Sequence, residues 1–149
     1  MVFTMTVAGC VDGSTGGTGD GGSPTVTFSG GDPTGTWFRI RITSDGKDIP
    51  FSPAEVKFNN GNYEDSLDGV FFSRGTYTTI GNEITLIPTH RYAFLPGKGY
   101  GWYSRDELSE DYLKLMIIPP RGYYSVSGNT LVIGYDTGNG KYFYTYSRK

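Results

Sequence analysis

The stretch Gly35-Thr-Trp-Phe-Arg-Ile-Arg-Ile42 decides the fold class of this 149-residue chain. Phe38, Ile40 and Ile42 recur at every second position and so fall on one face. Trp37 and the two arginines fall on the other face. A repeat of two residues is typical of a β-strand, in which successive side chains point to opposite faces. The stretch therefore predicts a strand whose apolar face is buried.

Short alternating segments of the same kind follow, separated by residues that favour tight turns. Asn and Gly tolerate positive φ and are common central residues of β-hairpin turns. Such turns are predicted at Asn59-Asn-Gly-Asn62, Leu67-Asp-Gly69, Gly81-Asn82, Gly128-Asn129 and Thr137-Gly-Asn-Gly140. A chain of eight or nine hairpin-linked strands removes its exposed edges by closing into a barrel. We therefore expect an all-β fold: a single antiparallel up-and-down β-barrel of about eight strands, with one short helix and a disordered Gly-rich tether in front.

Residues 88–111 interrupt this pattern and are predicted to form a long loop that leads into the short helix. The sequence Ser104-Arg-Asp-Glu107 is typical of a helix start, and the helix is expected to end near Leu113, before a strand over 113–118. Exposed aromatic side chains suit contact with another surface, whereas a loop packed on its own rings is the alternative. The candidate ligand- or partner-binding residues are Tyr92, Phe94, Tyr100, Trp102 and Tyr103.

The last predicted strand, Lys141–Ser147, carries three tyrosines on one face: Tyr142, Tyr144 and Tyr146. Residues two apart on a strand share a face. In a barrel that face is either the lumen or the outside, and the sequence alone leaves both arrangements open.

The first 32 residues differ in composition from the rest of the chain. Residues 11–31 hold eight glycines mixed with Ser, Thr and Asp, and such a segment behaves as a flexible coil. Before it, Val7-Ala8-Gly9-Cys10 resembles the lipobox of bacterial lipoproteins, in which small residues precede a cysteine that carries the lipid. The resemblance implies a signal-peptide remnant (1–9), a lipid-anchored tether (10–32) and a barrel domain (33–149). It also implies a bacterial cell envelope location, with a membrane as partner through Cys10. An incidental free thiol is the alternative.

The domain itself resembles bacterial lipocalin-like lipoproteins of the calycin type. The residues that carry the resemblance are Gly35-Thr-Trp37 on the first strand, Arg74-Gly-Thr-Tyr77, the Gly-Asn hairpins and the closing Tyr-rich strand that ends in Arg148-Lys149. In lipocalins the tryptophan of this G-x-W motif plugs the closed end of the barrel, and a basic residue near the last strand lies across its ring. The resemblance implies barrel closure by Gly35, Trp37 and Arg148, with a cation–π contact between the last two.

The chemistry of the chain offers little for catalysis. His90 is the only histidine, and the single cysteine excludes a disulfide framework and a cysteine-based zinc site. Asp136-Thr-Gly138 spells an aspartic-protease triplet but lies in a predicted hairpin turn. The acidic residues of the short helix, among them Asp106 and Glu107, are expected to be solvated. We therefore predict no catalytic residue, no metal and no cofactor.

The formal net charge of −2, with no basic stripe, argues against nucleic acid as a partner. The favoured function is a non-enzymatic module that binds a small apolar or amphipathic ligand in the barrel mouth. The alternative is an interaction protein, such as an envelope enzyme inhibitor or assembly factor, that acts through residues 88–111. An open apolar interior would favour the first and a filled interior the second. The sequence leaves the oligomeric state undetermined.

Overall fold

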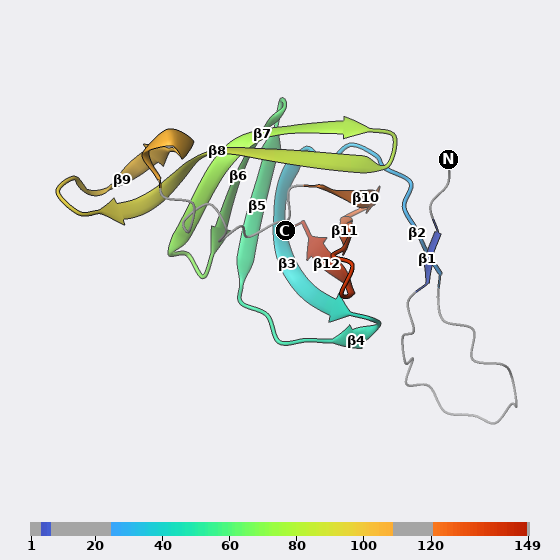
Figure 1. Ribbon diagram of the computed structural model, residues 1–149. Coiled ribbons are helices and arrows are strands. Elements are labelled where there is room, and N and C mark those ends of the chain that lie inside the picture. The colour runs from blue at the N-terminus through green and yellow to red at the C-terminus, as the bar shows by residue number, and fades with distance from the viewer. Residues whose placement is uncertain (1–3, 7–24, 109–120, 149) are drawn as a thin grey trace, which may run out of the picture.

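The computed structural model describes residues 4–6, 25–108 and 121–148, and its main body is a closed antiparallel β-barrel (Figure 1). The eight wall strands are β3 (Gly35–Ser44), β5 (Ala54–Asn59), β6 (Asn62–Leu67), β7 (Phe71–Ile80), β8 (Glu83–Leu95), β10 (Arg121–Ser127), β11 (Thr130–Asp136) and β12 (Lys141–Ser147). Each wall strand pairs with the next wall strand along the chain. The first, β3, also pairs with the last, β12, and this pairing closes the ring. The predicted up-and-down barrel is confirmed.

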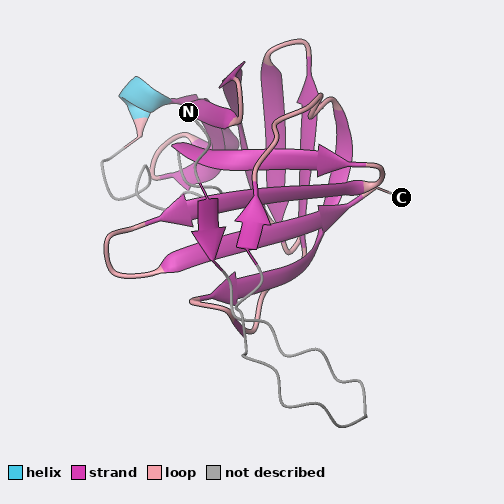
Figure 2. Cartoon of the chain, turned by 90° about the vertical axis from the view of Figure 1, so that its right-hand side faces the viewer, coloured by secondary structure: helices cyan, strands magenta, loops and turns pink. Residues whose placement is uncertain are grey.

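Smaller elements are attached to this wall. Strand β4 (Lys47–Asp48) pairs with the end of β3, and β9 (Gly99–Ser104) pairs with the second half of β8. Strand β1 (Thr4–Thr6) pairs with β2 (Thr25–Thr27) in a separate two-stranded sheet. Among the described residues the only helix is the single 3-10 turn η1 (Arg105–Glu107) (Figure 2). The predicted continuation of this helix to Leu113 and the strand over 113–118 lie outside the described residues.

The turns between wall strands have the backbone geometry that their residues predict. Asn60 and Gly61, between β5 and β6, have φ values of 46° and 77°. Gly81 and Gly128 begin the turns before β8 and β11, with φ values of 61° and 55°. Because positive φ is available to Gly and Asn at low cost, these residues allow the chain to reverse within two positions.

The inner face of β3 is not the apolar face that the sequence pattern predicts. Trp37 and Arg39 point into the barrel and are buried, whereas Ile40 is exposed on the outside. The pairing of β3 with β12 shifts register here and leaves Ile40 without a partner. Such a β-bulge reverses the alternation of faces. Ile42, after the bulge, is buried again, so the expected face of Phe38, Ile40 and Ile42 is wrong.

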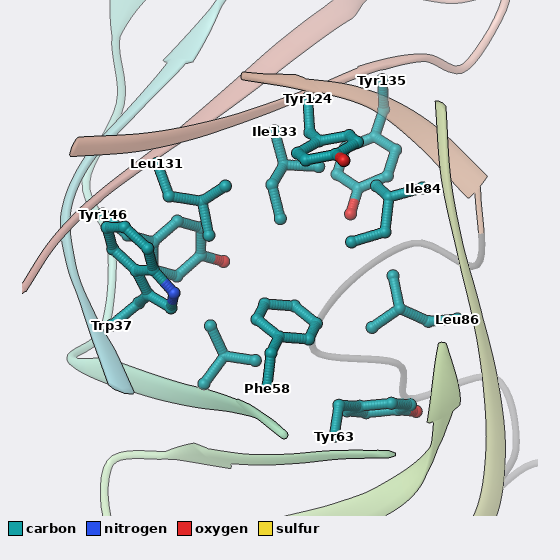
Figure 3. Packing of buried hydrophobic residues seen from close by; sticks show 11 residues of the cluster. Trp37, Phe58, Tyr63, Ile84, Leu86, Tyr124, Leu131, Ile133, Tyr135 and Tyr146 are labelled. Carbon is teal, nitrogen blue, oxygen red and sulfur yellow. The ribbon is translucent and has the colours of Figure 1, made fainter. Parts of the chain in front are cut away.

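The barrel interior contains one apolar cluster of side chains from most of the wall strands (Figure 3). Large side chains point toward one another across the lumen and fill it. The members that are at most 2% exposed are Trp37, Val56, Phe58, Tyr63, Ile84, Leu86, Tyr124, Leu131, Ile133 and Tyr146. At about 25 cal/mol per Å² of apolar surface removed from water, this cluster is a main source of stability.

Residues 26–34, here called the N-terminal strap, pack against the barrel although the tether was expected to extend to residue 32. Phe28 is buried and stacks on Phe143, with ring centroids 6.0 Å apart and planes 4° apart. The amide of Gly30 donates to the carbonyl of Tyr124 (2.9 Å), and the amide of Val126 donates to the carbonyl of Gly30 (2.9 Å). The folded unit therefore begins before residue 33, because Phe28 finds an apolar site on the outer face of the sheet.

The predicted long loop over residues 88–111 is instead a β-hairpin as far as residue 104, and residues 109–111 lie outside the described residues. Strand β8 continues past Pro88 to Leu95, and β9 returns alongside it through a turn at residues 96–98. Pro88 has no amide N–H, but it lies at a register shift in the pairing of β7 with β8, where such a residue is tolerated. This β8–β9 hairpin extends beyond the barrel wall, as Figure 1 shows.

Candidate functional site

One end of the barrel, where β3 begins, is closed by Trp37. Its ring is fully buried, and its Nε1 donates to the carbonyl of Pro33 at 2.7 Å. The Arg148 guanidinium carbon lies 4.3 Å from the ring centroid, and Arg148 Nη2 donates to the carbonyl of Thr34 at 2.7 Å. The structure therefore brings Trp37 and Arg148 together in the arrangement that the lipocalin resemblance implies.

Gly35 makes room for this contact. Its φ is 136°, and a Cβ atom built on it would lie 3.2 Å from Arg148 Nε. Only glycine adopts this conformation readily. Arg148 thus contacts both of the other residues named for barrel closure, Gly35 and Trp37, at the closed end, and the opposite end is here called the mouth.

Toward the mouth, the interior holds a polar layer made of the inward-facing side chains of Arg39, Asp65, Ser73 and Arg91. Asp65 pairs with Ser73 across β6 and β7, and Ser73 pairs with Arg91 across β7 and β8, so the three share one face. Arg39, Asp65 and Arg91 are each at least nine-tenths buried. Charged side chains are seldom buried to this extent unless they are paired or functional.

Asp65 has its hydrogen-bond partner within this layer. Both the amide and the hydroxyl of Ser73 donate to Asp65 Oδ1. Burial raises the pKa of the Asp65 carboxyl to about 6, against the opposing effects of the Ser73 hydrogen bonds and of the charges on Arg91 and Arg39. Desolvation outweighs the two nearby cations because the whole layer lies away from water.

Two of the three guanidinium nitrogens of Arg39 lack such partners. Its Nε and Nη2 atoms are buried and make no hydrogen bond. The hydroxyls of Tyr135 and Tyr146 are also buried and have no hydrogen-bond partner. Arg39 is directly opposite Tyr146 in the β3–β12 ladder, and its guanidinium carbon lies 5.8 Å from the ring centroid of Tyr144. Burial raises the pKa of the Tyr135 and Tyr146 phenols, so both stay protonated at neutral pH. Four buried polar atoms on three neighbouring strands therefore lack partners.

A cavity of about 350 Å³ opens at the mouth and has one of these residues, Tyr135, in its wall. Its walls are Tyr135, Thr137, Asn139, Tyr142 and Tyr144, from β11, β12 and the turn between them. The tyrosine row of the last strand therefore faces the lumen and its mouth. A second cavity of about 230 Å³ lies at the β5–β6 turn and is walled mostly by exposed polar residues. Of these two cavities, the first has a residue with an unpartnered hydroxyl, Tyr135, in its wall, and the second has none.

The aromatic residues of the β8–β9 hairpin divide between its two faces. Four of them form the aromatic face, which is exposed: Tyr92, Phe94, Tyr100 and Trp102. Tyr92 lies 5.8 Å from Trp102, and Phe94 lies 5.1 Å from Tyr100, between ring centroids. Tyr103 lies on the other face, buried against Ala93 and Leu108. Tyr103 is therefore structural, and its assignment to the binding residues is corrected.

The arginine at position 74 continues the aromatic face onto the barrel wall. Its guanidinium carbon lies 4.5 Å from the ring centroid of Trp102. Tyr92 also meets Phe72 of β7 edge to face, with centroids 6.2 Å apart. The exposed rings thus form one connected surface over β7, β8 and β9.

The remaining sequence candidates have local structural contacts. The Asp136 carboxylate accepts from the amide of Gly138 at 2.8 Å, as expected of a turn. Hydrogen bonds from Lys98 and Ser104 lower the pKa of the Glu107 carboxyl to about 2. His90 Nδ1 lies 3.0 Å from Thr89 Oγ1. Cys10 lies outside the described residues.

Within the described part of the chain, no three His, Cys, Asp or Glu side chains are grouped as a metal site would need. The same residues contain no helix that is long and apolar enough to cross a membrane.

The sequence interpretation missed the polar layer. Arg39 was assigned to the outer face of its strand, and neither Asp65 nor Arg91 was considered. The signal that could have found them is the two-residue alternation along each strand. Asp65 lies two residues after Tyr63, and Arg91 lies two residues before Ala93, and Tyr63 and Ala93 are both buried. Because side chains alternate along a strand, a charge in phase with buried residues points inward.

Comparison with known proteins returns no family model, no curated protein and no solved structure that matches this chain.

Proposed function

We propose that the barrel is a non-enzymatic binding module that takes a small amphipathic molecule at its mouth. The observation that supports this proposal is the cavity of about 350 Å³ between the tyrosines of β11 and β12. Pockets for small molecules commonly measure about 300–1,000 Å³ and combine apolar walls with a few polar groups. Tyrosine walls supply both an apolar ring surface and hydroxyl groups.

The filled half of the barrel limits what this ligand is. Trp37, Phe58 and Leu131 occupy the lumen near the closed end and are almost fully buried. An interior packed in this way leaves no space for a long apolar chain that runs the depth of the barrel. A compact molecule held at the mouth fits the described residues, and a carrier that encloses a fatty acyl chain along the whole barrel axis does not.

A titration with N-phenyl-1-naphthylamine, a neutral apolar fluorophore, tests the proposal. Saturable 1:1 binding is expected for the unmodified chain. Asn139→Trp places an indole at the cavity wall and is expected to weaken binding at least ten-fold. Asn129→Trp makes the same change in an exposed turn at the closed end and serves as the matched control. Absence of saturable binding, or equal binding by the two variants, would refute the proposal.

A second candidate function is partner recognition through the aromatic face, and the exposure of its rings favours it. Tyr100 is 75% exposed, and Phe94 is 50% exposed. Tyrosine and tryptophan dominate the energetics of many protein interfaces. A photo-crosslinking residue at Tyr100 is expected to capture one discrete partner in the native host. The same residue at Ile80, which is also exposed, is the control and should capture none. Identical patterns at the two positions would contradict this function.

We further propose that the module is held at a bacterial envelope membrane by a lipid on Cys10, facing the periplasm or the exterior. The support is the sequence Val7-Ala8-Gly9-Cys10 and the glycine-rich residues that follow it. When the protein is expressed with a complete signal sequence, it is expected to fractionate with membranes, and Cys10→Ala should release it. A wild-type chain that stays free of lipid and membrane would contradict the anchor.

A further inference from the structure

We infer that the polar layer inside the barrel is a subsite for a carboxylate group of the bound molecule, with Arg39 as its principal donor. The inference rests on the proposed function, because it names the chemistry of the ligand that enters at the mouth. Its basis is a set of buried donors that the described residues leave without acceptors.

The first step concerns Arg39 itself. The side chain is only 9% exposed, and its Nε and Nη2 atoms have no hydrogen-bond partner. An unpartnered buried donor costs about 1–3 kcal/mol, and more when it is charged, so native proteins rarely keep one without a role. Nε and one Nη form the edge of the guanidinium that binds a carboxylate through two parallel hydrogen bonds. The pair left free on Arg39 has this geometry.

The second step excludes Asp65 as the missing acceptor. Its Oδ1 atom already accepts from both the amide and the hydroxyl of Ser73. Of the two arginines that act on the Asp65 carboxyl, Arg39 has the weaker effect. Asp65 Oδ1 is therefore engaged with β7, and the Asp65 carboxyl accepts no hydrogen bond from Arg39 Nε or Nη2.

The third step concerns the groups around Arg39. The unpartnered hydroxyl of Tyr146 belongs to the residue directly opposite Arg39 on β12, and that of Tyr135 belongs to an inward-facing residue of β11, the strand beyond β12. A neutral phenol donates one hydrogen bond, so the two hydroxyls and the arginine edge offer four donated hydrogen bonds in total. A carboxylate accepts about four hydrogen bonds, which matches this number.

The fourth step is the charge on Arg39. The Arg39 guanidinium is positively charged and about nine-tenths buried, and no hydrogen bond joins its Nε or Nη2 atom to the carboxyl of Asp65. Burial makes an uncompensated charge expensive. An anion that reaches Arg39 is therefore favoured over a neutral group of the same size, and a planar carboxylate matches its two parallel N–H donors.

The last step is access. Tyr144 lies beneath the Arg39 guanidinium and also forms part of the cavity wall at the mouth. Tyr135 likewise contributes to the wall and carries one of the unpartnered hydroxyls. Tyr144 thus borders both the Arg39 guanidinium and the cavity. A ligand seated among the mouth tyrosines can direct its anionic group inward, past Tyr144, to Arg39.

Isothermal titration with hexanoate and hexanamide tests the inference, because these two molecules share a chain and differ in charge. The unmodified protein is expected to bind hexanoate at least ten-fold more tightly than hexanamide. Arg39→Met keeps the length of the side chain and should abolish the preference, and Arg39→Lys should retain part of it. Arg41→Met removes an exposed arginine of the same strand and should leave the preference intact.

The outcomes separate this inference from the proposed function. Equal affinity for hexanoate and hexanamide, with N-phenyl-1-naphthylamine still bound, would show that water satisfies Arg39 and would overturn the subsite alone. A preference that survives Arg39→Met in a folded variant would do the same. Tighter binding of hexylphosphonate than of hexanoate would contradict the carboxylate assignment. Failure of all these probes to bind would overturn both proposals.

Discussion

Asp65 shows how the barrel interior changes the chemistry of a single residue. The carboxyl is buried among Tyr63 of its own strand, Ser73 of β7, Arg91 of β8 and Arg39 of β3. Two cations and two hydrogen bonds favour the ionised form, yet burial still raises its pKa from 3.8 to about 6. The folded chain therefore holds a proton on Asp65 at pH values where the unfolded chain has released it.

This difference predicts a pH dependence of stability. Because the folded pKa is raised, the proton stabilises the fold fully below pH 4, and that stabilisation is lost as the pH rises through 6. A shift of about two pKa units corresponds to roughly 3 kcal/mol at most. Between pH 4 and pH 7 the wild type should therefore lose stability relative to Asp65→Asn, as measured by urea unfolding of both proteins at each pH. A wild type that gains on the variant over this range would contradict the raised pKa.

At the scale of elements, two β-bulges determine which side chains enter the lumen. One lies at Ile40 of β3, and the other lies between Arg74 and Gly75 of β7, opposite Pro88. At the second bulge the chains approach so closely that a Cβ atom on Gly75 would lie 2.1 Å from the carbonyl oxygen of Ile87. No side-chain rotation relieves a clash between Cβ and backbone. The bulge therefore depends on glycine at this position.

Replacement of this glycine is expected to distort the pairing of β7 with β8. Gly75→Ala should destabilise the protein by about 3 kcal/mol, as overpacking against a rigid neighbour does. Gly101→Ala in β9 is the control, because its Cβ would meet only ordinary contacts at 3.6 Å and beyond, and a change within about 0.5 kcal/mol is expected. Midpoints of urea unfolding give both values. Similar losses in the two variants would show that the close approach at Gly75 does not limit stability.

These bulges also explain which elements the sequence predicted and which it did not. The Asn-Gly and Gly-Asn turns are local signals, and they predicted the hairpins correctly. A bulge depends on the partner strand: the extra residue at Ile40 is defined by β12, about a hundred residues later. In the β8–β9 hairpin, Pro88, Pro96 and three glycines predict a break in the strand, and for that reason the predicted loop is wrong. The alternation of Tyr92 with Phe94 and of Tyr100 with Trp102 was the overlooked strand signal.

At the scale of the whole molecule, the N-terminal strap connects the outer face of the sheet with the closed end of the barrel. It supplies the carbonyls of Pro33 and Thr34 that bind Trp37 and Arg148. It also places Phe28 against Phe143 on the outer face of the sheet. The strap therefore runs along the outside of the barrel, from Phe28 beside the mouth half of β12 to the carbonyls that hold Trp37 and Arg148 at the closed end.

Removal of the Phe28 ring tests this role. Phe28→Ala should cost about 3 kcal/mol of stability, because it leaves a cavity over Phe143 and Gly134. Phe51→Ala is the control, since Phe51 is 41% exposed, and a change within about 0.5 kcal/mol is expected there. Guanidinium unfolding followed by tryptophan fluorescence measures both. If Phe28→Ala is as stable as the control, the strap does not contribute to the folded unit.

The candidate site could be predicted only in part, for reasons that also belong to the whole molecule. The contact between Trp37 and Arg148 follows a known family pattern and was expected. The polar layer combines Arg39, Asp65 and Arg91 from β3, β6 and β8, whose register no local pattern reveals. Whether each charged side chain points into or out of the barrel depends on the pairing register of its strand, because a shift by one residue exchanges the two faces. The β-bulge at Ile40 is not visible in the sequence pattern, and the pattern therefore places Arg39 on the outer face.

The pairing of β3 with β12 has a consequence for the timing of synthesis. Ser44 meets Tyr142, so one edge of β3 stays bare until about a hundred later residues have been made. At roughly 5–20 residues per second, that wait lasts on the order of 5–20 s. During it, β3 is open to pairing with neighbouring nascent chains, and its exposed Ile40 adds an apolar contact. A ribosome that stalls before the final strand leaves both β3 and β11 unpaired along one side, so a short C-terminal loss turns a closed barrel into an aggregation-prone open sheet.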